Sequence, residues 1–138
     1  MDFPYKQLNR ITRRPIINIL VKNNNESLNY EVLVDSGADH NLFNAEIAEE
    51  IGINVKSGKF FQTQGVGGVP LDCWLHQEVT LFVPGVSFVT VPVAFTYGLP
   101  PEGHGLVGQL GFFDQFTIKF DYRNGVVRIT KPNEREPS

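Results

Sequence analysis

Short apolar segments, separated by polar turn residues, recur along most of the chain. Residues 16–21 and 30–34 are rich in apolar and β-branched side chains, a pattern typical of buried strands. The segment between them, Lys22-Asn23-Asn24-Asn25-Glu26-Ser27, has the polar composition of a turn. Further strands are predicted at roughly 60–63, 73–83, 86–95, 117–120 and 126–129. This succession of short strands predicts a mainly β domain that resembles a barrel.

One segment interrupts the strands with a helical pattern. Asn44 is a favourable N-cap, Ile47 and Ile51 would share one face, and Gly52 can end the helix. We therefore predict a helix over residues 45–51.

The two ends of the chain differ in character from its middle. Residues 1–13 are polar and basic and are expected to form a loose N-terminal arm, whereas residues 132–138 are expected to form a frayed C-terminal tail. Residues 14–131 then form a single folded domain. Within this domain, the proline- and glycine-rich stretch 99–105 is expected to be a loop, and Tyr122-Arg123-Asn124-Gly125 has the composition of a hairpin turn.

Composition narrows the class of protein. A chain of 138 residues can bury about two thirds of its unfolded surface in one domain. With 41% hydrophobic residues and a net charge of −3, neither nucleic acid nor an anionic membrane is expected as a partner. No apolar run approaches the ~20 residues of a membrane span, and the N-terminus lacks a signal-peptide core. The single cysteine, Cys73, excludes an internal disulfide, so a cytoplasmic location is expected.

The most informative segment is Asp35-Ser36-Gly37-Ala38-Asp39, which directly follows the apolar run 30–34. A carboxylate at the end of a buried strand is costly to desolvate. Gly37 lets a backbone or a substrate approach where a Cβ atom would block it, and the Ser36 hydroxyl can donate to a carbonyl and fix the loop. An apolar strand, an acid and a tight loop together predict a reactive carboxylate that is held in place.

Taken alone, Asp-Ser-Gly is also common in solvated turns, but four further segments accompany it in a fixed order. Arg14-Pro15-Ile16-Ile17-Asn18-Ile19 precedes it, and Gly65-Val66-Gly67-Gly68, Leu106-Val107-Gly108 and Phe112-Phe113-Asp114-Gln115-Phe116 follow it. The ordered set resembles the first strand, catalytic loop, flap tip, apolar-apolar-Gly motif and final short helix of the retropepsin-like aspartic proteases. The resemblance spans roughly residues 13–121.

This resemblance implies a fold and an activity. The fold would be a single-domain, retropepsin-like acid-protease barrel, mainly β with one or two short helices, that forms a homodimer. The activity would be that of an aspartic endopeptidase, in which water activated between Asp35 and its symmetry mate hydrolyses peptide bonds in an extended peptide or unfolded protein. Ser36 and Gly37 would support the catalytic loop. Leu106, Val107 and Gly108 would form a structural motif of the fold.

The resemblance also implies a set of substrate contacts. Gly37, Ala38 and Asp39 would line the cleft, and a flap with Gly65, Val66, Gly67 and Gly68 at its tip would close over the substrate. Glycines suit a mobile tip because they allow positive φ. The bland alternative is a flexible hairpin end without a role in binding.

The chemistry itself predicts a second copy of the chain. Two carboxylates that lie about 3 Å apart cannot both ionise easily, so they share one proton, and the ionised member activates water. This sequence has only one Asp-Ser-Gly, so the second carboxylate must come from another copy across a two-fold axis. Neither a metal nor an organic cofactor is required. The three histidines lack metal-ligand spacing: His40, His76 and His104.

Two charged residues have both a functional and an ordinary interpretation. In the family, the aspartate that matches Asp39 is held by two arginines. One matches Arg14, which would contact the partner subunit, but the position of the other is occupied by Gln109. Alternatively, Asp39 caps a turn and Arg14 is a solvated surface charge.

The sequence leaves two alternatives to a general protease open. One is a dimeric peptide-binding module that has the same fold and the same apolar strands but no catalysis. The other is a protease that only releases itself from a precursor. Residues 103–108 also match the pattern G-x-G-x-x-G, but prolines precede them in place of a strand, which argues against a nucleotide site.

Overall fold

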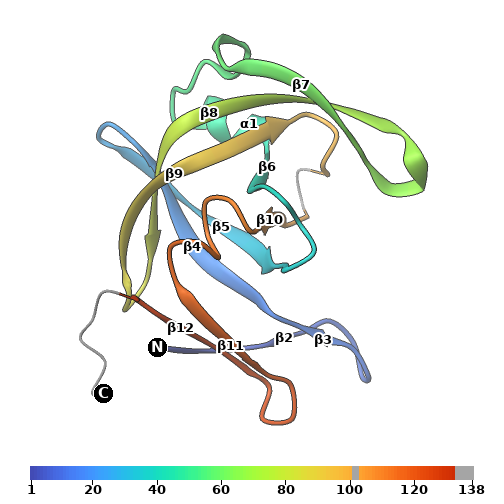
Figure 1. The fold of residues 1–138 in the computed structure, drawn as a ribbon, viewed down its shortest axis with the longest axis vertical. Coiled ribbons are helices and arrows are strands. Elements are labelled where there is room, and N and C mark those ends of the chain that lie inside the picture. Colours follow the sequence, from blue (N-terminus) through green and yellow to red (C-terminus); the bar gives the residue numbers. More distant parts are fainter. Residues whose placement is uncertain (101–102, 133–138) are drawn as a thin grey trace.

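Strands make up most of the computed structural model, which describes residues 1–100 and 103–132 (Figure 1). The largest sheet has seven strands in the order β4-β5-β10-β6-β9-β8-β7, and an additional pairing of β4 with β8 closes it on itself. Its strands are β4 (Ile16–Asn23), β5 (Glu26–Val34), β6 (Leu42–Asn44), β7 (Lys59–Gln64), β8 (Pro70–Val83), β9 (Ser87–Thr96) and β10 (Gly105–Val107). The predicted mainly β, barrel-like architecture is confirmed.

The first hairpin shows how the sequence produces this sheet. In β4, the side chains of Ile17, Ile19 and Val21 alternate with more exposed neighbours, so one face of the strand is buried. β4 pairs with β5 in an antiparallel register that places Ile19 opposite Tyr30. Asn24 has a φ of 54° in the connecting turn, a conformation that asparagine tolerates better than most residues.

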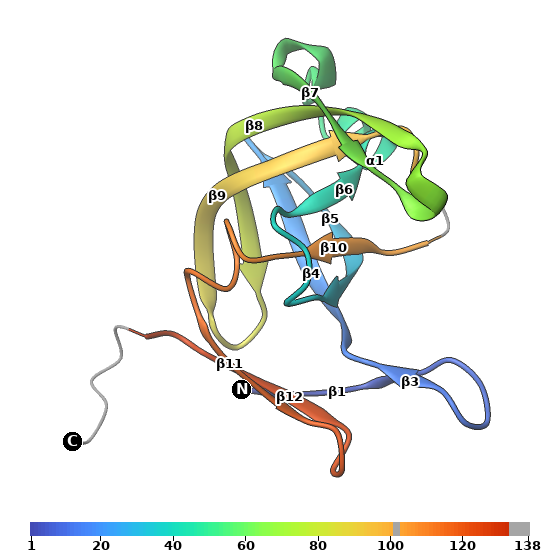
Figure 2. The same cartoon turned by 45° about the vertical axis from the view of Figure 1, so that its right-hand side comes forward.

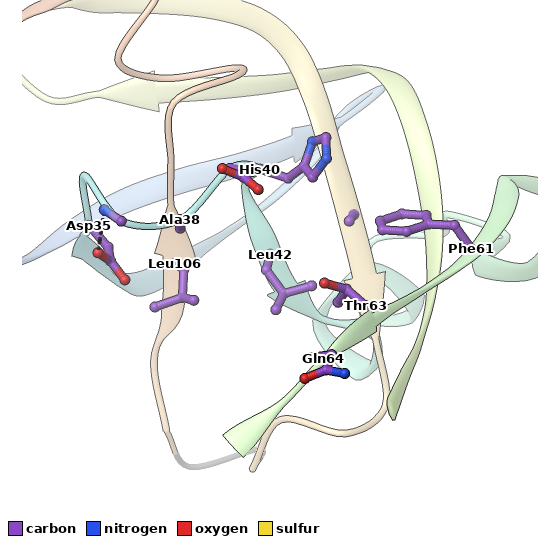
Figure 3. A pocket seen from close by; sticks show the side chains of 11 residues that line it. Asp35, Ala38, His40, Leu42, Phe61, Thr63, Gln64 and Leu106 are labelled. Carbon is purple, nitrogen blue, oxygen red and sulfur yellow. Dashed lines mark hydrogen bonds between the residues drawn. The ribbon is translucent and has the colours of Figure 1, made fainter. Parts of the chain in front are cut away.

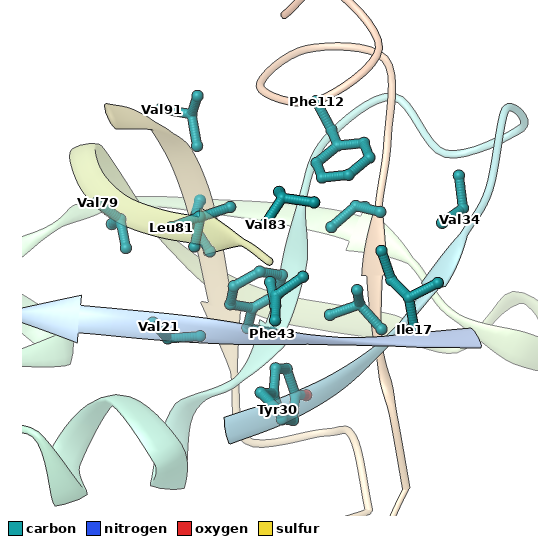
Figure 4. Close-up of a cluster of buried hydrophobic side chains, with 14 of the residues drawn as sticks. Ile17, Val21, Tyr30, Val34, Phe43, Val79, Leu81, Val83, Val91 and Phe112 are labelled. Atoms are coloured by element: carbon teal, nitrogen blue, oxygen red, sulfur yellow. The ribbon is translucent and has the colours of Figure 1, made fainter. Parts of the chain in front are cut away.

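The apolar faces of these strands meet inside the barrel (Figure 4). Phe43 is fully buried at the centre, where its ring makes edge contacts with Tyr30 at 5.2 Å and with Phe95 at 6.2 Å between ring centroids. Burial of one such side chain stabilises the fold by about 1.5–3 kcal/mol. The core therefore fixes β5 and β6, the two strands on either side of the segment that contains Asp35.

The helix α1 (Ala45–Glu50) begins where the sequence predicts. The Asn44 side chain accepts a hydrogen bond from the Glu46 backbone N–H at 2.7 Å, and Gly52 follows the helix with a φ of 81°. A 3-10 turn, η1 (Val55–Ser57), comes next and leads into β7.

The predicted short helix at 112–116 is replaced by successive turns. The amides of Gln115 and Phe116 both donate to the Phe112 carbonyl, at 3.0 and 3.2 Å. Phe112 is fully buried and Phe116 nearly so. The segment is therefore fixed by the packing of its aromatic side chains and is too short to propagate a helix.

The first residues form strands, which differs from the loose arm expected for residues 1–13. β1 (Asp2–Pro4) pairs with β12 (Val126–Thr130), which also pairs with β11 (Thr117–Asp121). The Met1 amine donates to the Ile129 carbonyl at 3.1 Å, and the Ile129 amide donates to the Met1 carbonyl at 2.9 Å. This three-stranded sheet lies at the end of the molecule opposite the β7–β8 hairpin (Figure 2).

Two short strands, β2 (Lys6–Gln7) and β3 (Arg13–Arg14), form a separate ribbon. Of the predicted tail, residues 133–138 lie outside the described residues. Among the residues that are described, no helix is both long and apolar enough to span a bilayer.

Candidate active site

The segment that contains Asp35 leaves the barrel between two strands that hold it in place. β5 ends at Val34, which is buried and lies beside Val107 of the parallel strand β10. The Asp35 amide donates to the Val107 carbonyl at 3.0 Å, and the Val34 amide donates to the Pro15 carbonyl at 2.9 Å. The backbone of Asp35 is therefore fixed by the core of the barrel.

The Asp35 carboxylate is half-buried and bonded to its own loop. Its Oδ1 atom accepts a hydrogen bond from the Gly37 amide at 2.9 Å, and the Ala38 amide donates to the Asp35 carbonyl at 3.1 Å. A Cβ atom at position 37 would lie 3.2 Å from Oδ1, which is tighter than an ordinary contact. Glycine therefore allows the amide of residue 37 to approach the carboxylate.

A second loop supports the first from the side. The Gln109 and Leu110 amides donate to the carbonyls of Ala38 and Asp39 at 2.8 and 2.9 Å. The Gln109 side chain also donates, from Nε2 to the Ser36 carbonyl at 2.8 Å. The sequence identified Gln109 only as a departure from the family pattern, and its contact with residue 36 was missed.

Asn41 is a further residue that the sequence did not indicate. Its side chain is fully buried, accepts a hydrogen bond from the Gly108 amide at 3.0 Å and donates to the Pro92 carbonyl at 3.1 Å. The Ala94 amide donates to the Asn41 carbonyl at 2.9 Å. In the sequence, Asn41 merely precedes the apolar pair Leu42-Phe43, which gives no signal of its buried contacts.

A pocket of about 270 Å³ opens beside the carboxylate (Figure 3). The loop contributes Asp35, Gly37, Ala38, Asp39 and His40 to its lining. The barrel and β7 contribute the remaining residues, Leu42, Ala94, Leu106, Phe61, Thr63 and Gln64. The floor of the pocket is thus polar and carries the Asp35 carboxylate, whereas its walls are largely apolar.

The β7 side of this pocket was not predicted. Phe61, Thr63 and Gln64 lie across the pocket from Asp35 (Figure 3), and the Phe61 ring lies 5.8 Å from the His40 ring between centroids. The only sequence signal for these residues was their place in a strand just before the glycine-rich segment.

The segment Gly65-Val66-Gly67-Gly68 forms the tip of the β7–β8 hairpin. It contains a 3-10 turn, η2 (Val66–Gly68), and both Gly67 and Gly68 have a φ of 76°. The Gly65 amide donates to the Val69 carbonyl at 2.7 Å, which closes the turn. Gly65, Gly67 and Gly68 lie beyond the lining of the pocket, whereas the strand that leads to them contributes to it.

The other predicted residues divide into two groups. Leu106, Val107 and Gly108 lie directly against the catalytic loop, and a Cβ atom on Gly108 would collide with the Ala38 carbonyl. Arg14 is exposed and bonds the neighbouring Arg13 carbonyl at 3.1 Å. Within the described part of the chain, Arg14 forms no ion pair and the Ser36 hydroxyl forms no hydrogen bond.

The remaining reactive groups lie elsewhere. Burial raises the pKa of the Cys73 thiol, which disfavours the reactive thiolate and agrees with a packing role. Within residues 1–100 and 103–132, no group of three or more His, Cys, Asp or Glu side chains is placed to hold a metal ion. The site therefore offers one carboxylate, oriented by a backbone amide, at the edge of a partly apolar pocket.

The chain is similar to known proteins both in sequence and in structure. Residues 20–110 match a family model described as aspartyl protease. No curated protein matches the chain. A crystal structure of a retropepsin-like aspartic protease from Rickettsia conorii superposes with a TM-score of 0.66 at 18% identity, over 93% of this chain and 98% of that one. EIAV protease complexed with the inhibitor HBY-793 superposes with a TM-score of 0.51 at 19% identity, over 74% of this chain and 88% of that one.

These similarities establish the fold. The structural match covers nearly the whole of the chain from Rickettsia conorii. The predicted retropepsin-like fold is confirmed.

Proposed function

Since the chain belongs to the aspartyl protease family, we propose that it is an aspartic endopeptidase that hydrolyses peptide bonds in extended polypeptides. The observation that carries this proposal is the Asp35 carboxylate at the edge of the pocket, with Oδ1 bonded to the Gly37 amide at 2.9 Å. A surface turn of the same sequence would have no pocket beside it.

The catalytic unit in this proposal is a homodimer. Each chain supplies one Asp35, and a two-fold axis brings the two carboxylates together so that they share one proton. The ionised carboxylate removes a proton from water, which attacks the scissile carbonyl carbon, while the protonated carboxyl gives its proton to the carbonyl oxygen. The tetrahedral intermediate then collapses: the C–N bond breaks and a proton passes to the leaving nitrogen. No metal and no organic cofactor takes part in this scheme.

The shape of the site supports an extended substrate. β7 is an edge strand of the seven-stranded sheet, so its free backbone groups can pair with a peptide strand. Leu42, Ala94 and Leu106 offer an apolar surface for one substrate side chain. Gly37, Ala38 and Asp39 form the floor of the proposed cleft, and the β7–β8 hairpin, with Gly65, Val66, Gly67 and Gly68 at its tip, acts as the flap.

The proposal also includes a contact with the partner subunit, a support for the catalytic loop and a cellular location. The Arg14 guanidinium is free to contact the partner subunit, since its side chain lies on the surface of the single chain. Ser36 supports the catalytic loop, where its carbonyl accepts a hydrogen bond from Gln109 Nε2. A fold with one cysteine needs no disulfide, which supports a cytoplasmic location.

The test is cleavage of a diverse library of unfolded peptides from acidic to neutral pH, with Asp35→Asn as the critical variant. This substitution removes the carboxylate but keeps its shape, so we expect a loss of at least 10³-fold in kcat/KM with the fold and the dimer unchanged. Asp121→Asn, a change at an exposed hairpin turn, serves as the control and should cleave normally. A wild-type protein that binds peptides but cleaves none across this range would identify a peptide-binding module instead.

A further inference from the structure

We infer that Gln109 is a positioning residue of the proposed active site, because its side-chain amide fixes the peptide group that supplies the Gly37 N–H to Asp35. The inference rests on the proposed function above.

The Ser36–Gly37 peptide group is bonded on both of its edges. Its carbonyl accepts from Gln109 Nε2 at 2.8 Å, and its N–H donates to Asp35 Oδ1 at 2.9 Å. A trans peptide is planar, so its C=O and N–H point in opposite directions. A hydrogen bond that fixes the direction of the carbonyl therefore also fixes the direction of the N–H.

Residues 35–38 form a β-turn, closed by the Ala38 amide on the Asp35 carbonyl at 3.1 Å, and Ser36–Gly37 is its central peptide. Asp35 at the first position of this turn favours the observed orientation of the peptide group, whereas Gly37 at the third position does not. The two common turn types differ by a flip of this central peptide, and glycine at the third position favours the type that requires positive φ there. Gly37 does not have a positive φ in this structure.

The observed turn thus adopts the arrangement that glycine does not select. If the peptide flipped, the Gly37 N–H would point away from the carboxylate, and Asp35 would lose this hydrogen bond. In the described part of the chain, the Gln109 side chain is the one donor to the Ser36 carbonyl. It is therefore placed to keep the peptide in the orientation that serves Asp35.

The backbone of Gln109 is held independently of its side chain. Its amide donates to the Ala38 carbonyl at 2.8 Å, and its carbonyl accepts from the Asp114 amide at 3.1 Å. The residue as a whole is exposed. Substitution of the side chain should therefore leave both the fold and the position of residue 109 intact.

Gln109→Met tests the inference, since methionine has a similar length but no donor. We expect kcat to fall about tenfold, the effect of one lost hydrogen bond, with KM nearly unchanged. Gln109→Lys, which restores a donor of similar reach, should recover kcat to within about twofold of the wild type. Gln115→Met is the matched control, because Gln115 is exposed and does not contact the catalytic loop.

A second measurement does not depend on activity. In ¹⁵N-labelled protein, the Gly37 amide proton should resonate downfield while it is bonded to the carboxylate. It should move upfield in Gln109→Met and return in Gln109→Lys. Kinetics are measured where the rate is proportional to enzyme concentration, so that dissociation of the dimer does not contribute.

The two proposals fail in different ways. Wild-type protein that cleaves nothing refutes the proposed function, while the Gly37 resonance still decides the orientation of the peptide. Wild-type protein that cleaves peptides together with a Gln109→Met variant of unchanged kcat refutes the role of Gln109. Equal losses in the Met and Lys variants also refute it, because the donor would then not be the property that matters.

Discussion

A single buried residue, Asn41, connects its own segment with two others around the candidate site. Its side chain binds Gly108 from the loop after β10 and Pro92 from β9, and its backbone carbonyl binds Ala94, which also belongs to β9. The Asn41 side chain is fully buried, so both backbone groups that it serves are kept from water. A buried polar group without a partner costs about 1–3 kcal/mol, so this residue matters more than its size suggests.

Asn41→Ala should lower the free energy of unfolding by about 2–3 kcal/mol, because it leaves the Gly108 N–H and the Pro92 carbonyl without a partner. Urea denaturation monitored by circular dichroism measures this change. Asn29→Ala, at an exposed position of β5, should change the same quantity by less than about 0.5 kcal/mol. Equal effects of the two substitutions would show that the buried amide contributes nothing specific.

The part of the site that the sequence predicts is the part encoded locally. Asp35, Gly37 and Ala38 lie within four residues of one another and follow an apolar strand, so the roles proposed for them rest on one short segment. Gln109 contacts residue 36 across 73 positions, and Asn41 contacts Gly108 across 67 positions. Such pairs arise only from the topology of the sheet, and a single sequence contains no signal for them.

The same distinction applies to whole elements. β4 and α1 carry their own signals, apolar alternation in the strand and an N-cap in the helix, and their predicted bounds are close to the observed ones. β5 is predicted only over 30–34, because its first residues, 26–29, are mostly polar and resemble a turn. β1 has only three residues and little apolar character, and it is a strand because β12 pairs with it from the other end of the chain. Local patterns therefore could not distinguish it from a loose arm.

Gly108, which directly follows β10, packs against the backbone of the loop after Asp35, and this contact limits the size of residue 108. A Cβ atom there would collide with the Ala38 carbonyl and would lie 2.7 Å from the His40 carbonyl. Both groups are backbone, so they can yield only if the loop moves. Gly108 and the loop after Asp35 therefore pack so closely that position 108 has no room for a larger side chain.

Gly108→Ala should therefore destabilise the protein by about 1–3 kcal/mol, the usual effect of overpacking, and should abolish most of the proposed peptidase activity. Thermal unfolding and kcat/KM are the two measurements. Gly103→Ala is a suitable control, because a Cβ atom at position 103 meets none of the residues that the structure describes nearer than 3.4 Å. If both variants retain full activity, the close packing of Gly108 against the loop is not required for catalysis.

At the scale of the whole molecule, the single chain forms a closed barrel but supplies only half of the proposed catalytic site. Its barrel has a continuous core, and the terminal strands pair within the chain in the three-stranded sheet. The proposed chemistry, however, needs two Asp35 carboxylates, and each chain supplies one. Folding and catalysis are therefore expected to depend on protein concentration in different ways.

Mixed dimers provide the sharpest test of this expectation. When the wild type is mixed and equilibrated with a ninefold excess of Asp35→Asn subunits, random pairing leaves about one tenth of the wild-type subunits in fully active dimers, so the activity should fall about tenfold. The mixed dimer holds only one ionisable carboxyl in the dyad and cannot share a proton between two. A ninefold excess of Asp121→Asn subunits, which keep Asp35, should cause no such loss. Activity that stays proportional to the wild-type concentration in the first mixture would mean that each chain acts alone, and the two-fold catalytic site would then be wrong.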